Sequence, residues 1–247
     1  MDIQEFQKLF EEEETYWWFV GKWRLMRQLV DDLQLRKDAL ILDLGCGCGM
    51  GLKNLSHYGK VTGFDREHAA LRFCRERHTS SSLVQGDVGH LPFKERGFDV
   101  IVALDLLEHI EDDRTLLKEL WRMTKQGGKV IVSVPCYPSL YSPHDLALHH
   151  KRRYTREELR SKVHAAGFTI KRMTHFNATM CLPIATVRCA RKIFGDSGAV
   201  PKSDLYLGIP RVVNTLLTKT LAGEAWICRR WSLPFGLSLY AVLVKSD

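Results

Sequence analysis

Short apolar runs alternate with stretches of helical periodicity through the first half of the chain. Nearly every position of each run is apolar, which is typical of strands that are buried on both faces. The runs are residues 39–44, 60–64, 98–104 and 129–134. The helical stretches between them are residues 51–58, 67–78 and 112–124. This alternation predicts an α/β fold in which helices cover both faces of a mostly parallel sheet.

Both flanks of this region add helices. Residues 3–34 have helical spacing, interrupted by Glu11–Glu14 and by the aromatic run Tyr16–Phe19. Thr155–Glu158 is typical of a capping box that opens a helix to about Ala166. Two further strands, at residues 168–173 and 237–244, are separated by two predicted helices near 178–194 and 209–230.

These elements predict a single domain in three parts. The parts are an N-terminal helical cap (1–37), a core sheet (38–175 and 237–247) and a helical insertion before the last strand (176–236).

Composition excludes several classes of protein. The 247 residues are 45% hydrophobic and 26% charged, values that argue against a disordered tail, a fibre or a coiled coil. No apolar window is long enough for a spanning helix, and Met1–Glu5 is unlike the start of a secretory signal. The seven cysteines are scattered and lack zinc-ligand spacing, so we expect reduced thiols, a cytoplasmic protein and no metal site.

Charge is distributed unevenly along the chain. Residues 1–150 hold 19 Lys and Arg against 23 Asp and Glu, whereas residues 151–247 hold 17 against 6. The basic second part suits an anionic substrate, an anionic membrane face or nucleic acid, and composition alone leaves these three open.

A glycine-rich loop follows the first predicted strand. Asp43 precedes Gly45, Gly47 and Gly49, and Asp65 ends the next strand, where a carboxylate suits the hydroxyls of a ribose. The dinucleotide pattern G-x-G-x-x-G is absent, because Met50 or Leu52 stands where it requires the last glycine. An acid before the loop would repel a pyrophosphate but suits a cationic amino-acid ligand.

In this order the motifs resemble the class I S-adenosylmethionine-dependent methyltransferases, in particular a type 11/12-like subgroup with a His-x-Arg-Arg-Tyr motif. The resembling motifs are Ile41–Gly49, Val61–Asp65, Gln85–Val88, Phe98–Ile101, Leu106–Ile110 and Gly127–Pro135. The resemblance implies a Rossmann-like, doubly wound, seven-stranded sheet, with S-adenosylmethionine as cofactor and S-adenosylhomocysteine as product.

The resemblance also implies which residues bind the cofactor. The glycines would line the methionine and ribose parts of the cofactor, and Asp65 would bind the ribose hydroxyls. Asp87 and Val88 would bind the adenine, and residues 104–109 would lie beside the methionine part. The expected cofactor-binding residues are Asp43, Gly45, Cys46, Gly47, Gly49, Asp65, Arg66, Asp87, Val88, Leu104, Asp105 and His109. Asp87 as a turn cap and His109 as a packed helix-start residue remain alternatives.

Flanking motifs resemble proteins that act on small molecules, glycans or lipid-linked sugars. They are Trp17–Phe19, His150–Tyr154 and Leu233–Ser238. We expect the substrate to contact an aromatic pair and a basic cluster. The alternatives are that the aromatic pair only packs in the core and that the basic cluster is only surface charge at the start of a helix. These residues are Trp17, Trp18, Arg152, Arg153 and Tyr154.

Methyl transfer from a sulfonium is an in-line displacement, and a hydroxyl nucleophile needs a general base. His150, then His149 and His144, are the candidates, because their loop follows the fifth strand at the edge where ligands bind. The alternative is that these histidines only anchor the loop or pair with Asp145.

The resulting functional hypothesis is O-methylation of a small molecule, a sugar or a lipid-linked glycan, whose acceptor could be anionic. The alternatives are methylation of RNA or protein, and a catalytically inactive cofactor-binding scaffold. Nucleic acid is not an expected partner, because no RNA-binding module is present. The basic amphipathic insertion suits peripheral contact with the inner membrane face, a substrate cap or a dimer face. Its cations are Arg188, Arg191, Lys192, Arg211, Lys219, Arg229 and Arg230.

Overall fold

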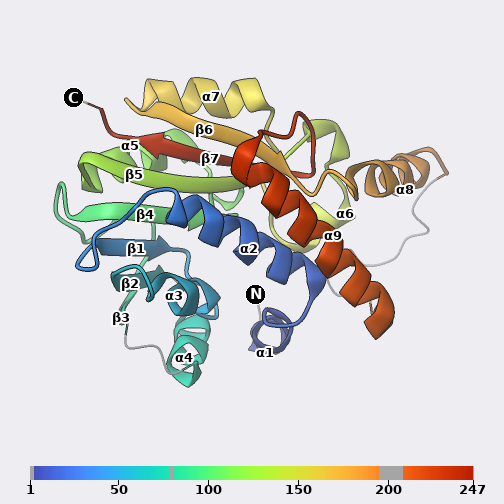
Figure 1. Ribbon diagram of the computed structural model, residues 1–247, viewed down its shortest axis with the longest axis horizontal. Coiled ribbons are helices and arrows are strands. Elements are labelled where there is room, and N and C mark those ends of the chain that lie inside the picture. The colour runs from blue at the N-terminus through green and yellow to red at the C-terminus, as the bar shows by residue number, and fades with distance from the viewer. Residues whose placement is uncertain (1–2, 78–80, 195–207, 247) are drawn as a thin grey trace.

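A computed structural model describes residues 3–77, 81–194 and 208–246, without the side chains of 3–5 and 189–194. Seven strands form one sheet in the order β3-β2-β1-β4-β5-β7-β6 (Figure 1). The strands are β1 (Leu40–Leu44), β2 (Lys60–Asp65), β3 (Ser82–Gln85), β4 (Phe98–Leu104), β5 (Thr124–Pro135), β6 (Thr169–Phe176) and β7 (Ser238–Val244). Strands β1 to β5 are parallel, and β7 runs antiparallel between β5 and β6. The predicted Rossmann-like, mostly parallel sheet is confirmed.

Helices cover both faces of the sheet, as Figure 1 shows. The helices are α1 (Ile3–Glu12), α2 (Trp17–Asp31), α3 (Met50–Leu55), α4 (His68–Glu76), α5 (Asp113–Met123), α6 (Pro143–Ala147), α7 (Arg156–Ala165), α8 (Cys181–Phe194) and α9 (Arg211–Arg230). Two 3₁₀ turns, η1 (Leu107–His109) and η2 (Pro138–Leu140), follow β4 and β5. One hydrophobic cluster joins the sheet to α2, α3 and α9, and a second joins it to α5 and α7.

The order of the strands positions the site. The chain passes from β1 to β2 on one side and returns to β4 on the other, so the direction of winding reverses between β1 and β4. Ligands of doubly wound sheets bind at the carboxyl ends of the strands that flank such a reversal. Here those ends lead into the glycine loop after β1 and into η1 after β4.

Helix α9 of the insertion packs tightly on α2. A Cβ atom on Gly21 would lie 2.5 Å from a methyl carbon of Leu221, so the glycine permits this close approach. Asn214 also accepts a hydrogen bond from the backbone N–H of Trp17 and donates one to the carbonyl of Thr15. The insertion therefore supports the start of α2, which carries the predicted aromatic pair.

Candidate active site

The glycine loop after β1 leaves space for a ligand. Gly45, Gly47 and Gly49 all have left-handed φ angles, of 78°, 51° and 86°. A Cβ on Gly47 would meet no described atom within 4 Å, so the loop backbone is open there. The N–H of Gly47 donates to Asp65 at 2.9 Å, which places the carboxylate at the end of β2 beside the loop. Burial raises the pKa of Asp65.

Asp43 lies beneath the same loop as a buried acid. Its Oδ2 atom has no hydrogen-bond partner among the described residues, and a Cβ on Gly51 would lie 2.0 Å from it. Burial raises the pKa of this carboxyl to about 7, although the charge of Lys22 opposes the shift. A cationic ligand group would stabilise its ionised form, so the residues present fit an amino-acid ligand such as the methionine part of the expected cofactor.

The other predicted cofactor residues lie in different surroundings. Asp87 is exposed and accepts a hydrogen bond from the N–H of Gly89 at 2.8 Å, which is the geometry expected if Asp87 only caps a turn. Val88 beside it is half-buried. Cys46 faces the core, with its Sγ atom 4.0 Å from that of Cys74. Arg66 is exposed and paired with Glu67. The roles of these residues in binding the cofactor remain predictions.

The end of β4 brings Leu104 and Asp105 to the carboxyl edge of the sheet. Asp105 accepts a hydrogen bond from Ser133 at 2.6 Å and forms an ion pair with Lys22 at 2.9 Å. Burial alone would raise the pKa of Asp105, but the Lys22 ammonium and the Ser133 hydroxyl hold it below its ordinary value. Lys22, which sequence reasoning missed, follows Trp18 by one helical turn.

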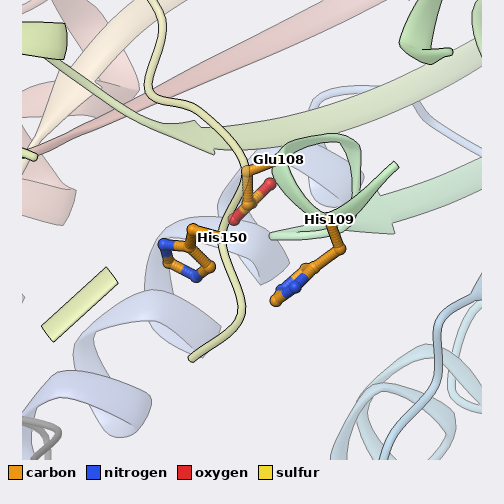
Figure 2. A group of neighbouring side chains, drawn as sticks. All are labelled: Glu108, His109 and His150. Carbon is orange, nitrogen blue, oxygen red and sulfur yellow. The ribbon is translucent and has the colours of Figure 1, made fainter. Parts of the chain in front are cut away.

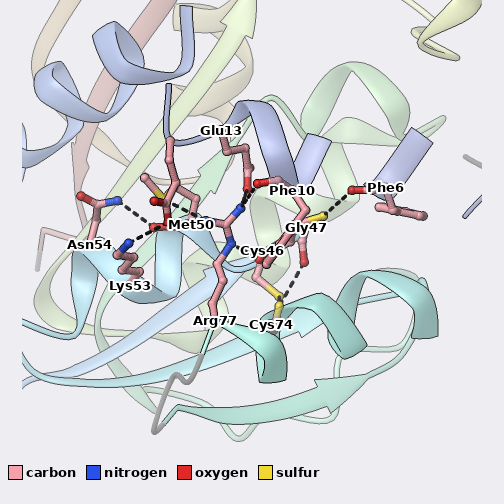
Figure 3. Close-up of polar contacts among 12 residues, drawn as sticks. Phe6, Phe10, Glu13, Cys46, Gly47, Met50, Lys53, Asn54, Cys74 and Arg77 are labelled. Atoms are coloured by element: carbon pink, nitrogen blue, oxygen red, sulfur yellow. Dashed lines mark hydrogen bonds and ion pairs between the residues drawn. The ribbon is translucent and has the colours of Figure 1, made fainter. Parts of the chain in front are cut away.

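Helix α1 covers the glycine loop and is held there by Arg77 (Figure 3). The guanidinium is 3% exposed and pairs with Glu13 at 2.8 Å. It also donates hydrogen bonds to the carbonyls of Cys48 and Phe10. These bonds join the end of α4 to the glycine loop and to α1. These bonds close one side of the candidate cofactor site.

A cavity of about 280 Å³ opens between the start of α2, η1, the segment around α6 and α8. It brings together several residues that were predicted separately, as cofactor, substrate or catalytic residues. These are Trp17, Trp18, Asp105, His109, His144, His150 and Arg153. The cavity lies next to the carboxyl end of β4, and no residue of the glycine loop is among those that line it.

Asp145 organises the polar side of the cavity. It is fully buried and accepts hydrogen bonds from His150 Nδ1 at 3.0 Å and from Arg153 Nε at 2.8 Å. Burial alone would raise the pKa of Asp145, but these two partners hold it well below its ordinary value. Because Nδ1–H donates to this carboxylate, the Nε2 atom of His150 is left as the proton acceptor.

Three of the predicted substrate-binding and catalytic residues lie outside the cavity. His149 is exposed, with a left-handed φ of 57°. Tyr154 is buried and donates its hydroxyl proton to Asp113 at 2.7 Å. Arg152 lies 3.6 Å from the same carboxylate and donates to the carbonyl of Glu111. The structure thus gives Arg152 and Tyr154 contacts that fix the loop before α7.

Among the cavity residues that sequence reasoning missed, four have charged or amide side chains. These are Lys22, Glu108, Asn177 and Arg188. Glu108 lies in the motif Leu106–Ile110, but only its neighbour His109 was predicted to be a site residue. Arg188 was noted only for its charge, and Asn177 carries no motif, so only the tertiary fold reveals that they line the cavity.

Comparisons with known proteins agree with this geometry. A methyltransferase domain model matches residues 42–132. A Mycolicibacterium smegmatis protein named probable S-adenosylmethionine-dependent methyltransferase is 28% identical over 53% of this chain and 52% of its own. The matched region is a class I S-adenosylmethionine-dependent methyltransferase domain. The alignments span 66%, 52% and 51% of the first three curated relatives, so the chain matches only part of their length.

Solved methyltransferases share the fold of this methyltransferase. One, solved with the Haloferax volcanii Trm112 methyltransferase activator, is 18% identical, with a TM-score of 0.64 over 99% of this chain and 95% of that one. A second, Haemonchus contortus phosphoethanolamine N-methyltransferase 2 with S-adenosyl-L-methionine, is 16% identical. Its TM-score is 0.59 over 89% of this chain and 52% of that one. S-adenosylmethionine is the cofactor of the family.

Proposed function

We propose that this methyltransferase transfers a methyl group from S-adenosylmethionine to a hydroxyl oxygen of an acceptor in the cavity, releasing S-adenosylhomocysteine. The observation that carries the proposal is the Asp145–His150 pair, because Asp145 orients an imidazole that lines the cavity at the carboxyl end of β4. The cofactor supplies a methyl group already activated on a sulfonium sulfur.

The chain's own residues would bind, orient and deprotonate the acceptor. Trp17 and Trp18 give the cavity an apolar wall on which a sugar ring or an aliphatic chain can pack. His150 Nε2 would accept the hydroxyl proton as the oxygen attacks the methyl carbon, and Asp145 would stabilise the resulting imidazolium. Arg153 keeps Asp145 ionised and in place.

Cofactor binding is tested by thermal unfolding. We expect S-adenosylmethionine and S-adenosylhomocysteine, at about a hundred times their dissociation constants, to stabilise the protein by about 2.7 kcal/mol. This corresponds to a shift of roughly 5–10 °C for a chain of this size. NAD should give no shift, and Asp65→Ala should reduce the shift because it removes the carboxylate beside the loop.

Asp38→Ala is the matched control, since Asp38 is exposed and lies far from the loop in an ion pair with Arg36. A shift with NAD alone would refute the interpretation of the glycine loop. With binding established, transfer of the radiolabelled methyl group to sugars and polyprenyl-linked sugars tests the acceptor. Label on nitrogen, carbon, RNA or protein would refute O-methylation of such acceptors.

We further propose that the acceptor is lipid-linked and is met at the inner face of an anionic membrane. Helix α9 presents an outward apolar stripe that includes Val212, Leu216 and Trp226, and Trp231 follows it. Trp226 and Trp231 are 72% and 70% exposed. The only acid of α9, Glu224, is buried in bonds to Ala178 and Thr179, so the charges exposed on the helix are all basic. None of the described helices is long and apolar enough to cross a bilayer.

Sedimentation with vesicles tests this surface. Wild-type protein should pellet with phosphatidylglycerol-rich vesicles at low salt, and high salt should release it, because the attraction is partly electrostatic. The double variants Trp226→Ser/Trp231→Ser and Lys219→Glu/Arg230→Glu should stay in the supernatant. Arg72→Glu/Arg75→Glu, on the exposed face of α4, should pellet like the wild type. Equal pelleting of all variants, or none by the wild type, would contradict the proposal.

A further inference from the structure

We propose that Glu108, His109 and His150 bind one divalent transition-metal ion in the acceptor cavity, and that an acceptor oxygen completes its coordination. This rests on the proposed function, since the ion would lie where that function places the acceptor. It departs from the expectation of no metal site, which was drawn from the spacing of the cysteines and histidines in the sequence.

The three side chains already have nearly the geometry of a metal site. One ligand atom from each, a carboxylate oxygen and two imidazole nitrogens, lies within 4.8 Å of the others. Figure 2 shows the Glu108 carboxylate next to both imidazole rings, which come from η1 and from the segment after α6. Ligands of a common ion are about 3–4 Å apart at metal–ligand distances near 2.1 Å, so small side-chain rotations would suffice.

Glu108 supplies the independent observation that points to a cation. The residue is 1% exposed, and neither carboxylate oxygen has a hydrogen-bond partner among the described residues. Burying an unpaired carboxylate is costly unless it is neutralised or finds a cation. The nearby cations Lys22 and Arg153 are engaged by Asp105 and Asp145. Glu108 is therefore left without a charged partner within hydrogen-bond distance.

His150 is arranged as a metal-ligating histidine usually is. A ligating histidine donates its second ring N–H to a carboxylate or a backbone carbonyl, which fixes the tautomer and the ring. His150 makes this bond through Nδ1 to Asp145 at 3.0 Å, which leaves its Nε2 atom for an ion.

The ligand set indicates which ion binds. Two imidazoles and one carboxylate suit Zn²⁺, Fe²⁺, Co²⁺ or Mn²⁺, whereas Mg²⁺ prefers ligands that are all oxygen. A bound ion would lower the pKa of a coordinated acceptor hydroxyl, whose proton would leave to solvent. His150 would then hold the ion instead of accepting the proton, and the oxygen would form its bond to carbon as the carbon–sulfur bond breaks.

Titration of the EDTA-treated protein with Mn²⁺ tests the site. The electron paramagnetic resonance signal of free Mn²⁺ measures how much ion stays unbound, and calorimetry repeats the titration with Zn²⁺. One equivalent of ion should bind. Glu108→Gln and His109→Asn should weaken binding at least tenfold, and Asp145→Asn should weaken it about 10–100-fold by releasing His150. His149→Asn is the matched control, because asparagine tolerates the left-handed backbone of this exposed residue.

Stoichiometric binding that Glu108→Gln and His109→Asn reduce and His149→Asn does not would support the site. No stoichiometric binding by the wild type, or equal binding by all variants, would overturn it. The melting temperature of each variant without ligand reports its folding, and the shift with S-adenosylmethionine reports its cofactor binding. Methyl transfer that persists in EDTA would leave His150 as the base and refute only the metal ion.

Discussion

Replacing Arg77 with methionine is expected to destabilise the methyltransferase by about 3–5 kcal/mol, because the variant leaves a buried carboxylate without its partner. The guanidinium, itself 3% exposed, bonds Glu13 and two backbone carbonyls and lies over the ring of Phe10. Burial already raises the pKa of Glu13 to about 7, and loss of Arg77 would raise this pKa further. Urea-induced unfolding measures the free energy, and proteolysis within α1 reports its release from the glycine loop.

Arg75→Met is the matched control, since Arg75 is exposed on the same helix and its replacement should cost less than about 0.5 kcal/mol. Affinity for S-adenosylmethionine should also fall in Arg77→Met, because α1 closes one side of the loop. Equal stability of the two variants would show that Arg77 does not hold α1 in place.

Asp145→Asn is expected to cost a similar 3–5 kcal/mol, although it changes only one atom of the side chain. The variant leaves the buried Arg153 without a counter-charge and removes the acceptor that orients His150. The melting temperature should fall on the order of 10 °C. Calorimetry of the variant and the wild type at the same pH measures the change.

Glu111→Gln is the matched control for this network. Glu111 is 81% exposed and pairs with Lys151 at the surface, so its replacement should change the stability very little. A loss of stability in Asp145→Asn no larger than in Glu111→Gln would contradict the structural role of the Asp145 network.

Periodicity predicted most of the fold because the strands of the central sheet are buried on both faces. The runs at 39–44 and 98–104 become β1 and β4, and the insertion helices lie within a few residues of their predicted positions. The short β3 was not delimited, because its four residues are only partly buried and alternate weakly. Helix α6 was also missed, since its five residues span little more than one turn.

The structure brings predicted site residues together where motif spacing alone fixes the geometry, and it separates them where tertiary contacts decide. The glycine loop and Asp65 come together across two adjacent strands, as the motif spacing predicts. His150 and His149 are neighbours in sequence, yet only His150 lines the cavity, because Asp145 holds its ring. The adjacent arginines separate in the same way, with Arg153 buried against Asp145 and Arg152 directed to Glu111 and Asp113.

The position of β7 between β5 and β6 has a consequence for synthesis of the chain on the ribosome. Strand β6 is made before β7 but pairs with no other strand, so it has no neighbour in the sheet until β7 emerges. Helix α9, which supports the aromatic start of α2, also emerges late. The nascent chain therefore exposes one edge of β5 until β7 emerges and one face of α2 until α9 emerges, and exposed strand edges and apolar faces of this kind favour aggregation during synthesis.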